Sequence, residues 1–326
     1  MEEPDSPFLV SLSHRAMATD FVVMLPKSCS QDADLAFQAL ESIDDIEAAL
    51  TIYQPNSEIS RLNRDGAKTP VALSKSTFDL LLRAKQWSEH TSGGFDITTG
   101  PLIDAWGFTS RSGKKPSDSE ISAARVLVGF EQLILDAADG TAKLAQQGVR
   151  VNLGAIGKGH ALDLIAAELR EQGMEHFLIH GGNSSIIAVG DQLPGSGDGW
   201  AVGIAHPTKP NRRIGGIKLR NQALGTSGSG KQFFHHQGKR FGHVIDPRTG
   251  YPAGDLLSLT VVADSATDAD AAATGCFVMG WDSVMKLDHQ ELGLAMIAVK
   301  PSKRQDEVAI STLGMIDFID PPCHQN

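Results

Sequence analysis

The stretch SATDADAAATGCFVMGW at residues 265–281 decides how the rest of the chain is interpreted. It predicts a helix, with Ser265 as the N-cap and Asp268 three residues later, a spacing typical of a capping box. Strand-like runs lie on either side of it, at 256–264 and 292–300. Its small alanines would let a neighbouring backbone or a ligand approach closely.

Further helices and strands are indicated along the chain. Helical periodicity is found at 31–50, 76–91 and 160–173, and short strand-like runs at 8–25, 133–137, 142–146, 149–153, 176–180, 200–207, 214–220 and 308–314. Residues 51–66 indicate a loop with a short helical turn, and 111–120 an exposed polar loop. Because helices and strands are interspersed without strict βαβ order, an α+β fold is favoured over a doubly wound sheet.

Composition narrows the class of protein. The 326 residues include 29 Lys and Arg against 39 Asp and Glu, a formal charge of −10, which argues against non-specific nucleic-acid binding. The apolar fraction of 41% and charged fraction of 21% exclude collagen, a long coiled coil and a largely disordered chain. The acidic balance raises the question of where an anionic substrate would find positive charge.

Neither a membrane segment nor a disulfide framework is expected. No run reaches about 18 apolar residues, and the N-terminus resembles no signal peptide or lipobox. We therefore expect a cytoplasmic chain without membrane insertion, although a chain whose leader had been removed would look the same. Cys29, Cys276 and Cys323 match no metal-site spacing, and Cys276 is expected to be a buried small apolar residue.

Two glycine-rich segments could bind a ligand. NLGAIGKG at 152–159 indicates a strand, a turn and a helix start whose amides, with Lys158, could bind phosphate; the alternative is a plain turn with a solvated lysine. GTSGSGKQ at 225–232 begins like a Walker A motif, but Gln232 stands where Ser or Thr should hold Mg²⁺. A nucleoside triphosphatase is therefore a remote alternative. A polar turn that presents Thr226 and Ser227 to a ligand is still a possible interpretation.

Asp270 and Thr274 are four residues apart and should share one helix face. With Asp264 and Asp268 nearby, a carboxylate and a hydroxyl so spaced suit a hard cation such as Mg²⁺. The alternative is a helix N-terminus enriched in Asp because of the helix macrodipole.

Two other segments carry candidate chemistry. In HVIDPRTG at 243–250, His243 could act as a general base and Arg248 could contact phosphate, or the histidine could be structural. The neighbouring His235 and His236 are interpreted as exposed. SGGFDITTGPLIDAWGF at 92–108 suits a loop around a flat or polar ligand, with Trp106 and Phe108 in the core.

Taken together, these segments resemble the FAD:protein FMN transferase family, also called the ApbE family. The resemblance covers about 260 residues in order. It includes MAT at 17–19, IDD at 43–45, Tyr53, SEISRLN at 57–63, GFDITTGPLIDAWGF at 94–108, NLGAIGKG at 152–159, GG at 181–182, TSG at 226–228, HVIDPRTGYP at 243–252 and ADAAAT at 269–274.

The resemblance implies a single two-lobed α+β domain over 1–326, with mixed or antiparallel sheets, flanking helices and a C-terminal strand and tail at 301–326. It implies Mg²⁺-dependent transfer of the FMN half of FAD to a Thr or Ser hydroxyl of a target protein, with release of AMP; Mn²⁺ stays possible. The acceptor would be a flavoprotein with an Asp-x-x-Ser/Thr-Gly-Ala/Ser-Thr motif.

The resemblance also assigns residues. The metal would be held by the Ala155 carbonyl and the side chains of Asp270 and Thr274, and His243 is a candidate base. The contacts to FAD would come from Met17, Tyr53, Phe95, Asp96, Ile97, Asn152, Lys158, Thr226 and Ser227.

Two departures from the family pattern stand out, and two other activities stay open. Asn152 replaces a common Asp, and Ser229 to Lys231 separate T-S-G from the aromatic residue Phe233. The same metal site could serve an FAD pyrophosphatase that gives FMN and AMP, or the chain could bind flavin without catalysis.

Overall fold

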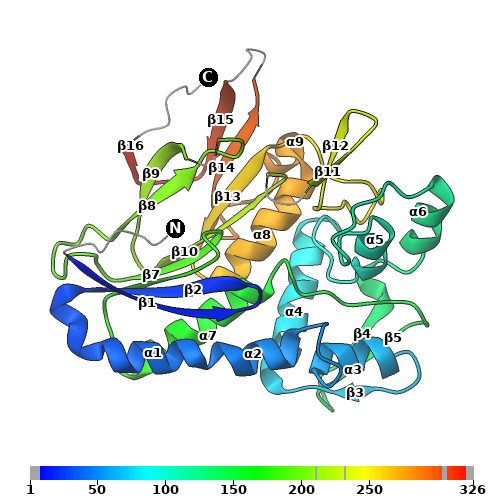
Figure 1. Ribbon diagram of the computed structural model, residues 1–326, viewed down its shortest axis with the longest axis horizontal. Helices are drawn as coiled ribbons and strands as arrows, with labels where there is room; N and C mark the ends of the chain where they lie inside the picture. The colour runs from blue at the N-terminus through cyan, green and yellow to red at the C-terminus, as the bar shows by residue number, and fades with distance from the viewer. Residues whose placement is uncertain (1–7, 210, 231–232, 303–306, 321–326) are drawn as a thin grey trace.

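A computed structural model describes residues 8–209, 211–230, 233–302 and 307–320 (Figure 1). Its centre is an eight-stranded sheet in which every neighbouring pair is antiparallel, in the order β1-β2-β6-β7-β10-β13-β14-β15. These strands are β1 (Leu9–Ala16), β2 (Thr19–Pro26), β6 (Phe177–Gly181), β7 (Ser185–Val189), β10 (Gln222–Gly228), β13 (Ser258–Ala263), β14 (Ala295–Pro301) and β15 (Val308–Leu313).

Three small antiparallel sheets surround the large one. They contain β16 (Phe318–Asp320), β9 (Arg213–Leu219) and β8 (Trp200–Ala205); β3 (Val71–Ala72), β5 (Thr141–Leu144) and β4 (Leu133–Asp136); and β11 (Phe233–His236) with β12 (Lys239–Gly242). The sheet of β8, β9 and β16 covers one face of the large sheet, where Trp200 and Ile217 are buried against Leu224 and Ile297.

The helices cover the opposite face and build a second lobe. They are α1 (Ala33–Glu41), α2 (Ile43–Leu50), α3 (Glu58–Asp65), α4 (Lys75–His90), α5 (Gly100–Ala105), α6 (Asp118–Arg125), α7 (Gly157–Glu171), α8 (Ala266–Met279) and α9 (Trp281–Val284), with short 3₁₀ turns at Lys27–Asp32 and Phe130–Gln132. The predicted α+β architecture with antiparallel sheets is confirmed. None of the described helices is long and apolar enough to cross a membrane.

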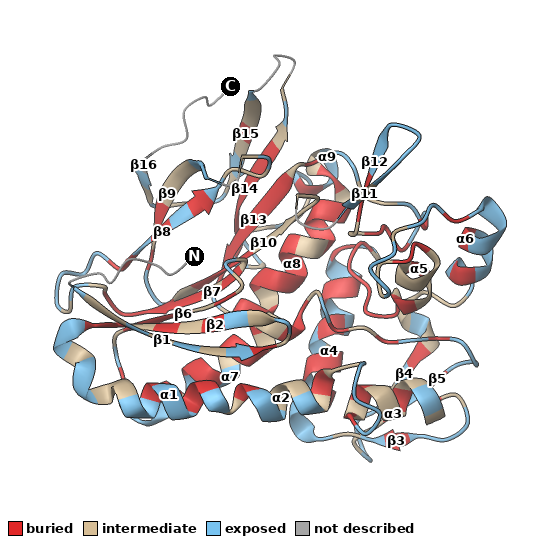
Figure 2. Ribbon diagram, in the orientation of Figure 1, coloured by how far each residue is buried: buried red, intermediate tan, exposed pale blue. Residues whose placement is uncertain are grey.

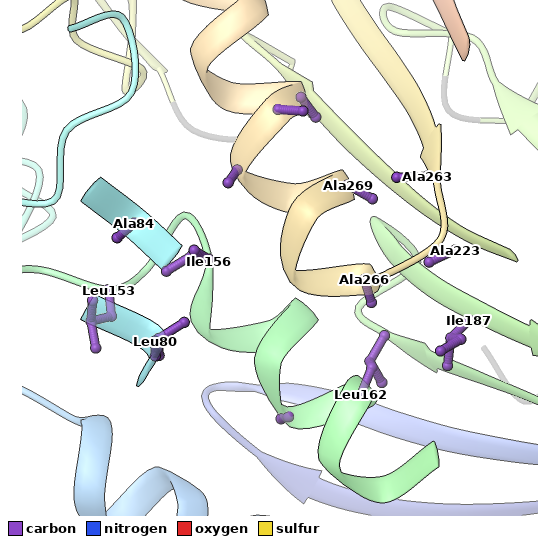
Figure 3. Close-up of a cluster of buried hydrophobic side chains, with 14 of the residues drawn as sticks. Leu80, Ala84, Leu153, Ile156, Leu162, Ile187, Ala223, Ala263, Ala266 and Ala269 are labelled. Atoms are coloured by element: carbon purple, nitrogen blue, oxygen red, sulfur yellow. The ribbon is translucent and has the colours of Figure 1, made fainter. Parts of the chain in front are cut away.

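Helix α8 lies at the centre of the molecule and is buried along most of its length (Figure 2). It packs between the large sheet, α7 and α4, and Figure 3 shows Leu162 of α7 beside Ala266 of α8. A Cβ at Gly159 would collide with the Ala266 carbonyl, and one at Gly225 would lie 2.5 Å from the Ala269 carbonyl. Both glycines therefore permit close backbone contact with α8 that no other residue would allow.

The N-terminus of α8 is held by a carboxylate from α7. Asp163 accepts hydrogen bonds from the amides of Ala266 and Thr267, both at 2.8 Å, and from the hydroxyls of Ser265 and Thr267. Ser265 caps the helix as predicted. The carboxylate of Asp268 turns instead to Arg83 and Trp87 of α4, so only the serine half of the expected capping box forms.

Several expectations from the sequence are wrong in detail. The helix expected over 31–50 is interrupted at Ser42, whose hydroxyl bonds to the Ala39 carbonyl at 2.7 Å and competes with the helical ladder. Residues 149–153 form no strand, because the Asn63 amide takes both the N–H and the C=O of Val151.

Two polar segments form regular structure that was not expected. The segment 111–120 is not all loop, because Ser117 and Glu120 form a capping box that starts α6. Residues 58–65 form a full helix, α3, where only a short turn was expected. Each helix is only eight residues long and buries two apolar side chains, Ile59 and Leu62 in α3 and Ile121 and Ala124 in α6.

The predicted burial of Cys276 is confirmed. Cys276 is buried in α8, and burial raises the pKa of its thiol to about 12. Cys29 is half-buried, and both thiols are free. Cys323 lies outside the described residues, as do Lys231 and Gln232 of the Walker-like segment.

Replacing Asp163 with alanine should destabilise the protein by about 2–4 kcal/mol, because four hydrogen bonds to one carboxylate and the cap of α8 are lost together. The free energy of unfolding is measured by denaturant titration. Asp139→Ala, an exposed carboxylate in the β4–β5 turn, is the control and should change it by less than about 0.5 kcal/mol. Equal stability of the two variants would contradict this role of Asp163.

Candidate active site

The Asp270 carboxylate is buried against two other elements. The Ser185 hydroxyl at the start of β7 donates to its Oδ1 at 2.7 Å, and the Gly159 amide in the first turn of α7 donates to Oδ2 at 2.9 Å. Burial raises the pKa of Asp270, and the positive charge of Lys158 opposes that shift. The ionised carboxylate therefore requires nearby positive charge beyond what these two donors supply.

Thr274 lies one turn further along α8, as the spacing predicted. Its Oγ1 is 2.8 Å from the Ser227 hydroxyl on β10. Thr226 is 2.9 Å from Thr260 instead, because successive side chains of a strand point to opposite faces of the sheet. The TSG segment is thus a strand rather than a tight turn, and it presents only Ser227 to α8.

The segment before α7 leaves a backbone acceptor open. A helix that began earlier would bond the Gly159 amide to the Ala155 carbonyl, but that amide donates to Asp270. Among the described residues no hydrogen bond ends on the Ala155 carbonyl. This unsatisfied oxygen therefore lies one turn before the residue that contacts Asp270.

These oxygen atoms fit a hard divalent cation. A carboxylate, a hydroxyl and a carbonyl are the ligands that Mg²⁺ accepts, and Mg²⁺ commonly completes its shell with water and substrate phosphates. The described residues contain no cluster of three or more His, Cys, Asp or Glu side chains. The site would therefore depend on the substrate for the rest of the coordination.

The other two acids near α8 do not join this site. Asp264 is exposed before the helix, and Asp268 is paired with Arg83 at 2.5 Å. The expected cluster of three aspartates is therefore wrong, because the helical turn directs Asp268 to α4 and Asp270 to the sheet.

The segment Phe95–Asp96–Ile97 runs beside the turn that leads into α7. The Asn152 amide donates to the Ile97 carbonyl at 2.7 Å, and Phe95 lies against Gly275 of α8. The side chain of Asn152 accepts from the Gly154 amide at 2.8 Å and so shapes the glycine turn. Phe95, Ile97 and Asn152, three of the predicted flavin contacts, thus lie close to α8 and to the turn before α7, which carry the candidate metal ligands.

Asp96 is a buried acid with a perturbed pKa. Its Oδ1 accepts from the amide and the hydroxyl of Thr98, at 2.7 and 2.6 Å, and the Thr98 hydroxyl in turn accepts from Gly129. Burial raises the pKa of Asp96 to about 6 despite these bonds. Asp96 therefore changes its charge close to neutral pH.

Met17 and Tyr53 lie on loops at the surface. Met17 is at the tip of the β1–β2 hairpin, where it and Ala18 have positive φ, and its amide donates to Glu47 of α2 at 2.7 Å. Tyr53 follows α2 and is 77% exposed, so its ring is available for stacking. No described contact links Tyr53 to the other predicted flavin contacts.

His243 lies between β12 and the turn at 246–250. Its ring packs edge-on at 6.4 Å from Phe108. In the turn, Arg248 forms two bonds of 2.9 Å to Asp246 and reaches the Val278 carbonyl of α8. Arg248 thus ties this turn to the end of α8, a role that its candidacy as a phosphate ligand did not anticipate. His235 and His236 are exposed, as expected.

The structure adds contacts that sequence reasoning missed. Ser185 holds Asp270, Ser227 holds Thr274, and Asp163 holds the start of α8. Of these three only Ser227 was a candidate, because single serines and helical acids carry no motif by themselves. The G181–G182 pair, which ends three residues before Ser185, was the one sequence signal near Ser185.

Known proteins are similar to this chain over most of its length. The model of the ApbE family matches residues 17–298. A protein of Haemophilus influenzae called FAD:protein FMN transferase is 31% identical over 290 residues, which are 86% of this chain and 83% of that protein. One of the same name from Vibrio cholerae is 30% identical over 276 residues, 83% of this chain and 80% of that protein.

Solved structures are similar to this chain over more than nine-tenths of its length. The ApbE protein of Thermotoga maritima superposes with a TM-score of 0.82 at 27% identity, covering 91% of this chain and 97% of that one. The flavin transferase ApbE of Vibrio cholerae has a TM-score of 0.77 at 27% identity and covers 94% and 96%.

The pKa of Asp96 predicts a pH dependence of stability. Since the folded-state pKa of about 6 exceeds the ordinary 3.8, the group stabilises the fold below pH 4, and this contribution is lost as pH rises through 6. The loss is about 3 kcal/mol. In Asp96→Asn the amide oxygen can keep both Thr98 bonds, so unfolding free energies measured at pH 4 and 7.5 should differ by about that much less than in the wild type. Parallel pH profiles would rule this out.

Proposed function

This chain belongs to the ApbE family and catalyses FAD:protein FMN transfer; we propose that the transfer depends on Mg²⁺, ends on a Thr or Ser hydroxyl of a target protein and releases AMP. The single observation that carries the proposal is the pair of Asp270 and Thr274 on α8, with Asp270 bonded to Gly159 and the open carbonyl of Ala155 one turn before that glycine.

The charge of the site supports a bound pyrophosphate. Asp270, Thr274 and the Ala155 carbonyl would hold Mg²⁺, which when bound neutralises negative charge on the pyrophosphate and on the departing AMP. Lys158 adds a positive charge in the first turn of α7, where the helix macrodipole also favours anions. A chain of charge −10 thus gains positive potential where the substrate needs it.

The flavin part of FAD would lie against Phe95–Ile97 and Asn152, with Tyr53 and Met17 on nearby loops. Stacking of Tyr53 on a ring would contribute about 1–3 kcal/mol by analogy with base stacking. These assignments follow the family resemblance, and the contact between Asn152 and Ile97 supports the pairing of the two segments.

The chemical step is an in-line displacement at phosphorus. The acceptor hydroxyl oxygen forms a bond to the FMN phosphorus, the bond from that phosphorus to the AMP oxygen breaks, and AMP leaves with the bonding pair. His243 takes the proton of the hydroxyl. Water in place of the hydroxyl would give FMN and AMP, which is the pyrophosphatase alternative.

Replacing Asp270 with alanine should reduce flavin transfer at least about 100-fold, because a carboxylate ligand of the cation is lost. The assay incubates the protein with FAD, Mg²⁺ and a fragment carrying the Asp-x-x-Ser/Thr-Gly-Ala/Ser-Thr motif, then follows the fluorescent flavin that survives denaturation. Thr274→Ala should have a smaller effect, about tenfold. Asp264→Ala removes an exposed carboxylate six residues earlier and should label at the wild-type rate.

The outcomes of that assay separate the functions. Wild-type labelling by Asp270→Ala would refute the metal assignment. AMP and FMN released without a labelled fragment would favour the pyrophosphatase, and tight FAD binding without any product would favour a non-catalytic flavin-binding protein.

Replacing His243 with asparagine should slow labelling by about 10²–10⁴-fold if its ring accepts the hydroxyl proton. FAD affinity, followed by flavin fluorescence, should stay within a few-fold of the wild type, because the substitution leaves the phosphate contacts in place. His289→Asn, in the segment between α9 and β14, is the matched control. An unchanged rate for His243→Asn would show that another residue accepts the proton.

A further inference from the structure

The β11–β12 hairpin is a separate two-stranded sheet that projects from the molecule (Figure 2), and His243 directly follows its second strand. Its inner side is an aromatic cluster: Phe234 stacks on Phe241 at 5.5 Å, and Trp106 and Phe108 lie against Phe234. This cluster fixes the hairpin on the lobe of α5 and α6. The side chains of the opposite face, Phe233, His235 and Arg240, are exposed.

The exposed part of the hairpin and the loop beside it are basic in an acidic protein. Lys239 and Arg240 are both exposed and point to opposite faces of the two-stranded sheet. Lys239 lies 5.8 Å from the ring centre of Phe241, and Arg240 lies 3.9 Å from that of the exposed Phe233. The adjoining loop at 107–115 adds Arg111 and Lys115, since Gly113 of this loop packs on Phe234. Residues 107–115 and 233–243 contain five Lys and Arg and no Asp or Glu.

Most of this charge is not neutralised within the protein. Lys114 pairs with Glu120 at 3.2 Å. Arg111, Lys115, Lys239 and Arg240 form no ion pair with any residue that the structure describes. Four exposed cations on one hairpin and the loop packed beside it repel one another, so this region is suited to a ligand that brings carboxylates.

The basic surface is continuous with the candidate active site. Arg240 donates to the Ser229 carbonyl at 2.5 Å, and Gly242 packs on Ser229. Ser229 is two residues from Ser227, which contacts Thr274. His243 directly follows β12. A polypeptide lying on the hairpin would therefore have its neighbouring residues at the reacting groups.

We propose that the β11–β12 hairpin and the 107–115 loop form the docking surface for the acceptor protein, and that they recognise an acidic segment beside its flavinylated hydroxyl. The proposal rests on the proposed function, because that function requires a protein acceptor at this site. Exposed charges of this kind chiefly raise the rate of encounter and so depend on ionic strength.

The test uses two acceptor fragments with the same motif, one flanked by four Glu and the other by four Gln. At low salt the wild type should label the Glu-flanked fragment with a kcat/KM about fivefold to tenfold higher, and about 0.5 M NaCl should remove the preference. The charge-reversal variant K115E/K239E should lose the preference while keeping its FAD affinity.

The matched control is K68E/K143E, which changes the net charge equally at exposed lysines near β3 and on β5. It should keep the preference. No labelling of either fragment by the wild type would refute the proposed function itself. Equal labelling of both fragments, or equal loss in both variants, would refute only the docking surface.

The last experiment tests whether the basic region binds an anionic membrane instead. The wild type should not sediment with vesicles of phosphatidylserine and phosphatidylcholine at physiological salt. Sedimentation that K115E/K239E abolishes and K68E/K143E retains would assign the surface to a membrane and overturn its role for the acceptor.

Discussion

The close packing of α8 is the constraint on which the rest of the structure depends. Its alanines are buried on all sides, so the helix has no solvent face, and it meets α7 and β10 at backbone distance through Gly159 and Gly225. Asp163 fixes the helix along its axis by binding the first amides. Asp270 and Thr274 then have one possible direction, toward Ser185 and Ser227.

This packing also explains the electrostatics of the site. A carboxylate at Asp270 is removed from water and receives only two donors, so the fold disfavours its ionised form. That cost is offset by Lys158 and would be offset further by a bound cation. In this acidic protein both the first turn of α7 and the β11–β12 hairpin carry exposed or partly exposed positive charge. These are the two places where we propose that anionic groups of the substrates bind.

Local signals predicted local structure well. The Ser265 cap, the spacing of Asp270 and Thr274, and the burial of Cys276 are confirmed because each depends on neighbours within one or two helical turns. Competing hydrogen bonds explain the failures. Ser42 bonds to its own helix and interrupts it, Asn63 replaces a strand partner of Val151, and Arg83 removes Asp268 from the expected acidic cluster. The last two partners lie 88 and 185 positions away along the chain, beyond the reach of local sequence signals.

By itself the sequence determined the α+β class, the helix that carries the candidate metal ligands and, through the order of its motifs, the family. Only the tertiary structure decided which side chains contact one another. Thr226 and Ser227 are adjacent in sequence but lie on opposite faces of β10, and Ser185 reaches Asp270 across 85 positions. The physical reason is that burial, packing and charge depend on neighbours brought together in space, which the spacing of residues along the chain does not specify.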